Sequence, residues 1–428
     1  MNAYCGLFTD SSQASNWVYR GEGNANILFA YTGSQPELQG KLLRLTKSKT
    51  AVHENGNVSS AAEDKEWAER HAAQLRDNTA YSKDVIGALI GPEYIQDPEI
   101  IEISASFITE LNQTAEPSRP ENRTHKQADP RQTLGSLVPD MIHAPTSERS
   151  KAGRHTVAVE IKPKWGYLPD SASLSPETSV KHRVCRFCMK QYTKQESVEE
   201  TISEFCPLDL YSKNSTRIGH ALDCLMKNPQ NNLRVFVDGQ IVGSSDDGLA
   251  MDIDRIPDVN RLKQIVTDII LTERLFPCLA QAQQRLDYMD IEGIFPKYQS
   301  ALESGEISTS EPTIKDWLQA VQEYLERESS NTSGPTLTDS YISDRQAVLE
   351  FMIAVTLKDI SVMLCFESWP PVDESIGDGS LPEYRIAIID ADPKKLHKIP
   401  DYLKQDQKIV DKYLKANPSI AQQKVCYE

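Results

Sequence analysis

The first part of the chain alternates short apolar runs with residues that accept tight turns. Such alternation is typical of strands that are joined by turns and short loops. A stretch rich in glycine and asparagine, residues 21–26, separates the first two runs, and Pro36 precedes the third. The pattern predicts three strands within residues 15–47, centred on positions 18–19, 27–31 and 41–45.

The remainder of the chain mixes helical spacing with a few β-branched runs. Apolar residues that recur every three or four positions predict helices over residues 63–76, 180–193, 259–286, 300–326, 346–355 and 399–413. Runs of β-branched and apolar residues predict strands at residues 155–161, 360–366 and 384–389, and a hairpin that turns at Asp238 and Gly239. Polar residues predict a surface loop at 112–132 and a low-complexity segment at 328–340.

Strands therefore dominate the N-terminal part, whereas the larger remainder combines helices with a few strands. This division predicts an α+β fold. The change in character places a boundary between two lobes near residues 140–155. The sequence contains no internal repeat.

The charge of the chain restricts its ligands. Its 428 residues include 46 Lys and Arg against 62 Asp and Glu, which gives a formal net charge of −16. The field of such a chain repels nucleic acids and anionic membranes, so we expect no direct binding to either. Any polyanion that the chain does bind must meet a local pocket of basic residues.

Eight cysteines are scattered through the sequence, and the first residues lack the basic and apolar regions of a signal peptide. We therefore expect an intracellular protein whose thiols are reduced. Cys185 and Cys188 form a CxxC pair, but no second pair stands at a usual distance. The spacing thus speaks against a zinc site.

Gly21, Glu22 and Gly23 lie between two predicted strands. Glycines at such a turn let backbone N–H groups approach a phosphate, and Arg44 on the following strand could add positive charge. A plain hairpin turn has the same composition, and Asn26 stands where a GxGxxG motif would end in glycine. This stretch alone leaves both interpretations open.

Two basic stretches could serve an anionic ligand. Glu160, Lys162 and Lys164 alternate at the end of a predicted strand and share one face while the chain stays extended. Residues 179–194 contain several Lys and Arg but no acid, and Arg186 and Lys194 lie two helical intervals of four apart. Each stretch is either part of a pocket for a small polyanion or a solvated surface.

Acidic residues stand at the ends of predicted apolar elements. Asp359 lies between a helix and a strand, and Asp390 and Asp392 directly follow the strand at residues 384–389. Acids in such places commonly build a magnesium and general-base site for phosphoryl transfer, although each could also be a solvated loop residue. The HRD and DFG motifs of protein kinases and the P-loop motif are absent. ATP-dependent phosphoryl transfer is the account that best unites these features.

Motifs along most of the chain resemble those of the inositol-pentakisphosphate 2-kinase family. Their number, order and spacing carry the resemblance, because several are weak singly. They comprise WVYRGEGNAN at residues 17–26, GPEY at 91–94, EIKPK at 160–164, Arg186 with Met189 and Gln191, PLDLYS at 207–212, PQNNLRVF at 229–236, Ala354 to Met363 with Thr356, Lys358, Asp359 and Ser361, and Ile389, Asp390, Asp392 and Lys394.

The resemblance implies transfer of the γ-phosphate of ATP to the axial 2-hydroxyl of inositol 1,3,4,5,6-pentakisphosphate, which gives inositol hexakisphosphate. It also implies a two-lobed inositol-phosphate-kinase fold, distantly like that of protein kinases. A sheet-rich N-lobe would span residues 1–140, a hinge residues 141–154, and a C-lobe with a helical inositol-binding part residues 155–428. The alternative is a non-catalytic inositol-phosphate-binding remnant, which would be free to lose Asp359 or Asp390, and both are present.

The resemblance further implies the roles of individual residues. Asp359 corresponds to the catalytic base with Lys162 beside it, and Asp390 to the magnesium ligand with Asp392 as a helper. ATP would contact Gly21, Glu22, Gly23, Asn24, Ala25, Asn26, Arg44, Pro139, Asp140, Met141, Glu160 and Met363. The inositol phosphate would contact Lys49, Arg123, Lys162, Lys164, Arg186, Lys194, Asn231, Asn232, Lys394, Lys398 and Tyr402. Lys398 stands where an Arg is common, which keeps the charge but loses the bidentate fork.

One departure from the family concerns zinc. Plant relatives carry a Cys/His zinc site after the motif DIEG, here residues 290–293, but no Cys or His occurs between Asp290 and Leu349. We therefore expect no structural zinc. We expect ATP and Mg²⁺ as cofactors, small molecules as the partners, a monomer, and the nucleus in preference to the cytoplasm.

Overall fold

An antiparallel sheet of six strands organises the first of two compact units, which comprises Met1–Thr79 and Gln96–Ala152. The computed structural model describes residues 7–49, 60–142, 155–193, 202–242, 256, 258–330, 342–369 and 381–428. The strands predicted within residues 15–47 are confirmed as β1 (Trp17–Glu22), β2 (Asn26–Tyr31) and β3 (Lys41–Lys49). The sheet is completed by β6 (Leu134–Pro139), β4 (Glu99–Glu102) and β5 (Lys126–Ala128).

Alternating side chains of this sheet form a core with helix α3 (Ala105–Ala115). Ile27 and Phe29 of β2 are buried against Phe107, whose backbone N–H is capped by the Ser104 hydroxyl. The surface loop predicted at residues 112–132 is therefore wrong in part, because the last turn of α3 and the whole of β5 lie within it. The buried Asn112 bonds through its amide to the backbone N–H and C=O of Ala128, so a polar residue supports a strand there.

The second unit comprises Ala80–Ile95 and Gly153–Glu428. Its first segment follows α1 (Ala61–Ala80), the helix predicted at residues 63–76, and contains a π-helical turn at Tyr81–Ile86 and the short α2 (Gly87–Ile90). The sequence pattern did not indicate that this segment, which Gln96–Ala152 of the first unit separate from the rest of its unit, packs with it.

A five-stranded antiparallel sheet forms the centre of the second unit. Its order is β11 (Tyr384–Ile389), β10 (Ser361–Trp369), β7 (His155–Ile161), β8 (Leu233–Val237) and β9 (Gln240–Ile241). The predicted strands and hairpin are confirmed here. Asp238 and Gly239 have φ angles of 49° and 74°, as a two-residue hairpin turn of the primed type requires.

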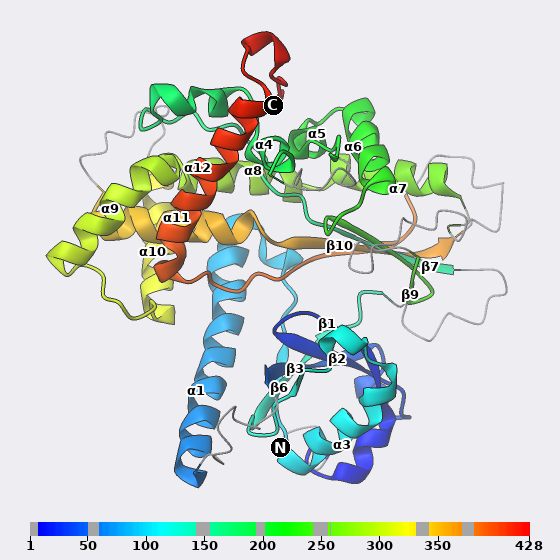
Figure 1. Cartoon of the computed structure of the whole chain (residues 1–428). Helices are drawn as coiled ribbons and strands as arrows, with labels where there is room; N and C mark the ends of the chain where they lie inside the picture. Colours follow the sequence, from blue (N-terminus) through cyan, green and yellow to red (C-terminus); the bar gives the residue numbers. More distant parts are fainter. Residues whose placement is uncertain are drawn as a thin grey trace. The chain divides into compact units, whose positions relative to one another are not determined.

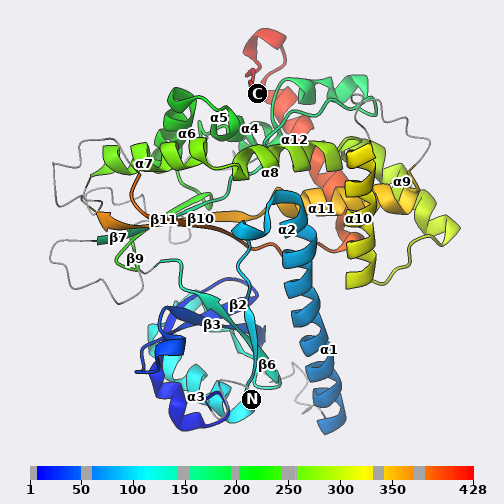
Figure 2. The ribbon, with the colours of Figure 1, turned by 180° about the vertical axis from the view of Figure 1, so that it is seen from behind.

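Helices α4 to α8 lie on one face of this sheet (Figures 1 and 2). α11 contacts α8, α9 and α10, and its residues are buried on nearly all sides, whereas α12 packs against α4 and α9. The helices are α4 (Arg186–Gln191), α5 (Pro207–Tyr211), α6 (Ser215–Lys227), α7 (Val259–Thr272), α8 (Leu275–Leu286), α9 (Asp290–Ser304), α10 (Ile314–Ser330), α11 (Asp344–Leu357) and α12 (Ile399–Ala416). Among the described residues, no helix is both long and apolar enough to cross a membrane.

The prediction of a single helix at residues 180–193 is wrong. The chain forms a 3-10 helix at Pro176–His182 and then α4, because Cys185 adopts an extended conformation with ψ 149° and caps α4. The helix predicted at residues 259–286 is broken between α7 and α8, where Glu273 is extended. Residues 331–340 of the predicted low-complexity segment lie outside the described residues.

Candidate active site

Two lysines leave the end of β7 and meet two aspartates. The Lys162 ammonium lies 3.1 Å from Oδ2 of Asp390, and that of Lys164 lies 3.2 Å from Oδ1 of Asp359. Lys164 has a φ of 59°, so the chain turns there, and the Glu160 carboxylate instead stays buried in the sheet. Glu160, Lys162 and Lys164 were predicted to share one face of the strand. Only the two lysines point to the same group of carboxylates.

The register of the sheet brings the two aspartates together. Ser361, the first residue of β10, pairs with Ile389, the last residue of β11. Asp359 precedes this pair and Asp390 follows it, so both carboxylates stand at the same end of the two strands. Their side chains are 52% and 57% exposed, which leaves both carboxylates accessible to a ligand.

Lys394 completes the cluster. Its ammonium lies 2.8 Å from the second carboxylate oxygen of Asp359, so that carboxylate is held between Lys164 and Lys394. Burial raises the pKa of Asp359, but the charges of the two lysines outweigh it and lower the pKa to about 2. Burial lowers the pKa of Lys164, as does the nearby charge of Lys162, while Asp359 opposes both effects. Asp359 is therefore ionised at neutral pH.

Gln283 fixes the two loops that carry this cluster. Its side chain, in α8, is fully buried and donates to the carbonyl oxygens of Lys164 and Leu357, each at 3.0 Å. It also accepts a hydrogen bond of 2.8 Å from the backbone N–H of Gly166. A Cβ on Gly166 would lie 2.9 Å from the ring of Tyr211, so glycine is needed for this close approach. The sequence analysis missed Gln283, because nothing distinguishes it from other polar residues of a helix.

Lys358 points inward, although it neighbours the exposed Asp359. It is 4% exposed and forms an ion pair with Asp287, which also accepts a hydrogen bond from the hydroxyl of Tyr167. Its ammonium also lies 5.5 Å from the centres of the Tyr167 and Phe351 rings. These contacts hold the buried side of the loop between α11 and β10.

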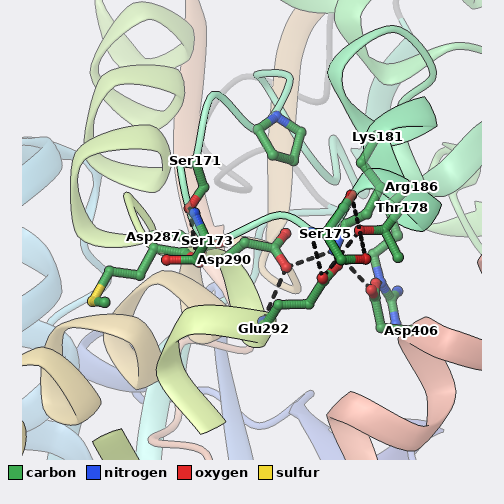
Figure 3. A network of polar contacts seen from close by, with 12 residues as sticks. Ser171, Ser173, Ser175, Thr178, Lys181, Arg186, Asp287, Asp290, Glu292 and Asp406 are labelled. Atoms are coloured by element: carbon green, nitrogen blue, oxygen red, sulfur yellow. Dashed lines mark hydrogen bonds and ion pairs between the residues drawn. The ribbon is translucent and has the colours of Figure 1, made fainter. Parts of the chain in front are cut away.

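A second buried network surrounds Lys181 (Figure 3). Its ammonium lies 2.5 Å from Asp290, 2.8 Å from Asp406 and 3.1 Å from Glu292. Lys181 is only 2% exposed, so it does not belong to a ligand-binding face of residues 179–194. Burial lowers the pKa of Lys181, but Asp290 and Asp406 more than reverse this effect and raise it.

The same network holds Arg186, which the sequence assigned to the inositol phosphate. The Arg186 Nε lies 3.1 Å from Oδ1 of Asp406, and Nη2 donates to Gln405 at 3.1 Å. The guanidinium also stacks over Trp165, with 5.0 Å between its carbon and the ring centre. Trp165 follows Lys164, so these contacts connect Arg186 to the lysine cluster.

Other predicted ligand residues of the second unit lie near this cluster in the chain or in space. Asn232 accepts from the Lys162 N–H at 2.9 Å, is 3% exposed, and its Oδ1 has no hydrogen-bond partner among the described residues. Burial and then the charge of Asp359 raise the pKa of Tyr402. Asn231 is exposed, and the Lys398 ammonium lies 3.1 Å from the Asp401 carboxylate. Asp392 is partly buried, and its backbone carbonyl accepts a hydrogen bond from the Thr356 hydroxyl at 3.5 Å.

Glu160 and Met363 face each other across β7 and β10. The Glu160 carboxylate accepts from the Ser361 hydroxyl at 2.8 Å and lies 3.2 Å from Arg234. Its predicted contact with ATP stays a prediction. Lys194 lies outside the described residues, as does the side chain of Lys49.

The residues predicted to cover the ATP phosphates form a turn in the first unit. The N–H of Gly23 donates to Asn26 at 2.9 Å and closes the turn between β1 and β2, in which Asn24 and Ala25 lie. The Glu22 carboxylate is buried in ion pairs with Lys47 and Arg119, so it is not available to a ligand. Arg123 donates to the Glu22 carbonyl at 3.1 Å and thus supports the turn.

The remaining nucleotide residues lie on the same sheet. Arg44 is on β3 opposite Leu28. Pro139 ends β6, and Asp140 and Met141 follow it, with Asp140 held by Gly40 and by Arg20 at 3.6 Å. Asp140 is 4% exposed, so its carboxylate is buried at the end of the sheet.

Comparison with known proteins identifies the family of the chain. The family model for inositol-pentakisphosphate 2-kinase matches residues 19–408. A protein of that name from Arabidopsis thaliana is 30% identical, and the match covers 95% of each chain. Proteins of the same name from Danio rerio and Cryptococcus neoformans are 27% and 25% identical over 95% and 93% of each chain. The chain belongs to the inositol-pentakisphosphate 2-kinase family.

Proposed function

We propose that this protein transfers the γ-phosphate of ATP to the 2-hydroxyl of inositol 1,3,4,5,6-pentakisphosphate. The observation that carries the proposal is the cluster in which Lys164 and Lys394 hold Asp359 while Lys162 holds Asp390. The full-length relatives that match it are named inositol-pentakisphosphate 2-kinases.

The cluster has the charges that the reaction needs. A pentakisphosphate is a dense polyanion, and ammonium groups hold phosphate through charge-assisted hydrogen bonds. Each of Lys162, Lys164 and Lys394 could exchange its carboxylate partner for a phosphate oxygen. Because the chain carries a net charge of −16, binding must come from such short-range contacts.

We assign Asp359 to the reacting hydroxyl. Phosphoryl transfer passes through a loose transition state, so the main task of this group is to orient the nucleophile and accept its proton late. Asp359 suits this task because it is ionised at neutral pH and accessible. Gln283 and Lys358 hold its loop, which keeps the carboxylate in place for in-line attack.

The residues at the end of β11 fit a magnesium ion. Asp390 offers accessible carboxylate oxygens, and Asp392 follows two positions later with a further carboxylate. Hard oxygen ligands of this kind are those that Mg²⁺ prefers. When bound, the ion would neutralise charge on the transferred phosphoryl oxygens. Lys162, 3.1 Å from Asp390, could release that carboxylate and turn to phosphate.

The lobed architecture belongs to the same proposal. We infer a two-lobed, kinase-like fold with an N-lobe at residues 1–140, a hinge at 141–154 and a C-lobe at 155–428. The turn between β1 and β2 and the residues after β6 would bind ATP. The family resemblance supports this proposal, together with the two separate sheets. Monomeric state and nuclear localisation stay predictions.

An assay of substrate specificity tests the proposal. The full chain is incubated with ATP, Mg²⁺ and a panel of inositol phosphates, and the products are separated by anion-exchange chromatography. We expect conversion of the 1,3,4,5,6-pentakisphosphate to the hexakisphosphate, and no product from pentakisphosphates already phosphorylated at position 2. Tight binding of the pentakisphosphate without turnover would favour the non-catalytic binding module.

A matched pair of variants locates the activity. D359N keeps the shape of the side chain but removes its negative charge, and we expect turnover to fall about 10²–10⁴-fold. D223N changes an aspartate that is exposed to a similar extent, 57%, and is paired with Lys263 at 2.6 Å on the surface. We expect D223N to retain turnover, and equal losses in both variants would remove Asp359 from the mechanism.

A further inference from the structure

A loop of the second unit contacts the segment just before α12. The loop comprises residues 305–313, between α9 and α10, and it passes the start of α12 (Figures 1 and 2). One carboxylate oxygen of Glu311 in this loop accepts the backbone N–H of Leu396 at 2.8 Å, and the other lies 2.7 Å from Nδ1 of His397. Both oxygens are therefore bonded to one short stretch of chain that lies 85 residues further along.

This stretch begins two successive helices that have no side-chain cap of their own. A 3-10 helix (Leu396–Lys398) runs directly into α12, and the N-cap positions of the two helices are Lys395 and Lys398. Neither lysine forms a capping hydrogen bond, because an ammonium group has no acceptor atom. The first N–H groups of a helix favour a negatively charged acceptor, so Glu311 supplies from another loop the cap that the local sequence lacks.

Lys394 lies between two fixed points of the chain. Leu396, two residues after it, is 4% exposed and is bonded to the loop. Asp392, two residues before it, accepts a hydrogen bond from the Thr356 hydroxyl at 3.5 Å through its backbone carbonyl. The backbone on both sides of Lys394 is thus tied, and this sets the direction from which its ammonium reaches Asp359 at 2.8 Å.

Two tyrosines show that Glu311 lies within electrostatic reach of the candidate active site. Burial raises the pKa of Tyr402, and the charges of Asp359, Asp401 and Glu311 add to this effect. Burial and the charge of Glu311 also raise the pKa of Tyr298 in α9. Glu311 is therefore close to α9 and to the first turn of α12, and Tyr402 senses its charge together with that of Asp359.

An acid beside a pocket for a polyanion needs a reason, because its charge repels the ligand. Both oxygens of Glu311 are engaged by the chain, and the partial positive charge of the helix start offsets the carboxylate. Glu311 is thus better placed to hold the neighbouring lysines than to contact a ligand itself.

We propose that Glu311 is a positioning residue for the inositol phosphate. It caps the start of the 3-10 helix and so holds Lys394 and Lys398, which stand on either side of Leu396, where they meet the substrate phosphates. The role rests on the proposed function, which assigns these two lysines to the inositol phosphate. Side chains that are already fixed lose less freedom when they bind, so loss of the cap should weaken binding of this substrate.

Steady-state kinetics on variants of the full chain test the proposal. E311A removes the acceptor, and we expect the KM for inositol pentakisphosphate to rise about 5- to 30-fold, the factor that corresponds to the loss of one helix cap. The KM for ATP should change much less. E311Q keeps an oxygen that can accept the Leu396 N–H, so it should recover most of the loss.

Glu306 provides a matched control from the same loop. It accepts the N–H of Arg345, in the first turn of α11, at 3.2 Å. However, α11 also has its own cap, Ser343, and its start lies fourteen residues, about 20 Å of helix, from the end that precedes Asp359. We expect E306A to leave both KM values unchanged, and an equal rise in E306A and E311A would overturn the proposal.

Two further measurements separate positioning from a general loss of stability. Because Glu311 is proposed to act through Lys394, E311A should change the KM much less in K394A than in the wild type, and effects that simply multiply would contradict the proposal. Hydrogen exchange of peptides that contain Leu396 needs no substrate. We expect faster exchange in E311A but not in E306A, and unchanged exchange in E311A would also overturn the proposal.

The positioning role and the proposed function fail by different results. Should the wild type bind the pentakisphosphate without turnover, the same variants are compared by their dissociation constants from calorimetry. A wild type that neither binds nor phosphorylates the pentakisphosphate would overturn the proposed function, and the role of Glu311 with it. An active wild type together with an unchanged KM in E311A would overturn the role of Glu311 alone.

Discussion

Lys164 donates to Asp359 across 3.2 Å, although the two residues are 195 positions apart in the chain. The pairing depends on the end of β7 and the start of β10, which are neighbours in the sheet. It keeps Asp359 ionised, and the carboxylate in turn favours the charged form of Lys164. A polyanionic substrate that attracts Lys164 would therefore free the carboxylate for the hydroxyl group.

The low pKa of Asp359 predicts a pH dependence of stability. Its folded pKa of about 2 lies below the ordinary value of 3.8, so its ionisation stabilises the fold above pH 3.8, and this contribution is lost as the pH falls towards 2. We expect D359N to lower the urea midpoint by a constant amount from about pH 5 to pH 8 and by less below about pH 4. The effect should be small, because the side chain is half exposed.

Urea titrations of both proteins across this pH range provide the measurement. D223N is the control, since its aspartate is also exposed and is paired with Lys263 on the surface. A difference in urea midpoint between wild type and D359N that grows as the pH falls would contradict the assigned direction of the pKa shift.

Local pattern was enough to predict most strands and several helices of this chain. β7 and β11 have the predicted bounds, because β-branched runs of this kind fit a buried strand. The helix predicted at residues 180–193 failed because Cys185 leaves helical geometry to cap α4. Capping depends on the tertiary role of that residue, and no periodicity shows it.

The family resemblance identified the lysines and aspartates of the site, and the structure places five of them together. The sequence could not identify residues whose partners lie far away along the chain. Gln283 is 119 residues from the Lys164 carbonyl that it bonds, and Lys181 is 225 residues from Asp406. Such residues are recognisable only when the fold brings their partners to them.

Lys394 should act on the inositol phosphate more than on ATP. Charged hydrogen bonds contribute about 1.5–3 kcal/mol each, so K394A should raise the KM for the inositol phosphate on the order of 10- to 100-fold. The KM for ATP should change much less. Because Lys394 also touches Asp359 at 2.8 Å, kcat should fall as well. The same division is predicted for K194A, although Lys194 lies outside the described residues.

Steady-state kinetics with each substrate varied in turn give both constants. K297A is the matched control, because Lys297 has similar exposure and pairs with Asp344 at 2.9 Å, and it is assigned to neither ligand. An increase confined to the KM for ATP would show that the basic residues are divided wrongly between the two ligands.

Gln283 should act as a positioning residue for Asp359. Q283L removes three hydrogen bonds and leaves two buried carbonyl groups without this partner, each at a cost of about 1–3 kcal/mol. We expect lower stability and a fall in kcat with little change in the KM for ATP. Thermal unfolding and steady-state kinetics measure the two effects separately.

Q346L provides the comparison for Gln283. Gln346 is also a buried glutamine and donates to Ala320 at 2.8 Å and Glu350 at 2.7 Å, but it lies eleven residues, about 16 Å of helix, before the end of α11. We expect Q346L to lower stability while kcat is retained under conditions where the variant is folded. A similar kcat loss in both variants would reduce the role of Gln283 to folding.

Lys181 should be among the most costly charges to remove from this unit. K181M keeps the length of the side chain but leaves Asp290, Asp406 and Glu292 facing one another in a buried space, and such a loss typically costs about 3–5 kcal/mol. K263M, which breaks the surface pair with Asp223, should cost about 0–1 kcal/mol. Urea unfolding at pH 7 measures both.

The pH dependence of this loss identifies its cause. Burial already raises the pKa of Asp290 to about 6, and without the opposing charge of Lys181 the folded-state pKa of Asp290 should rise further. A carboxyl group with a raised folded pKa favours the fold when it is protonated, so the variant should recover stability as the pH falls from about 8 to about 5. A deficit that stays constant over this range would indicate lost packing rather than unpaired charge.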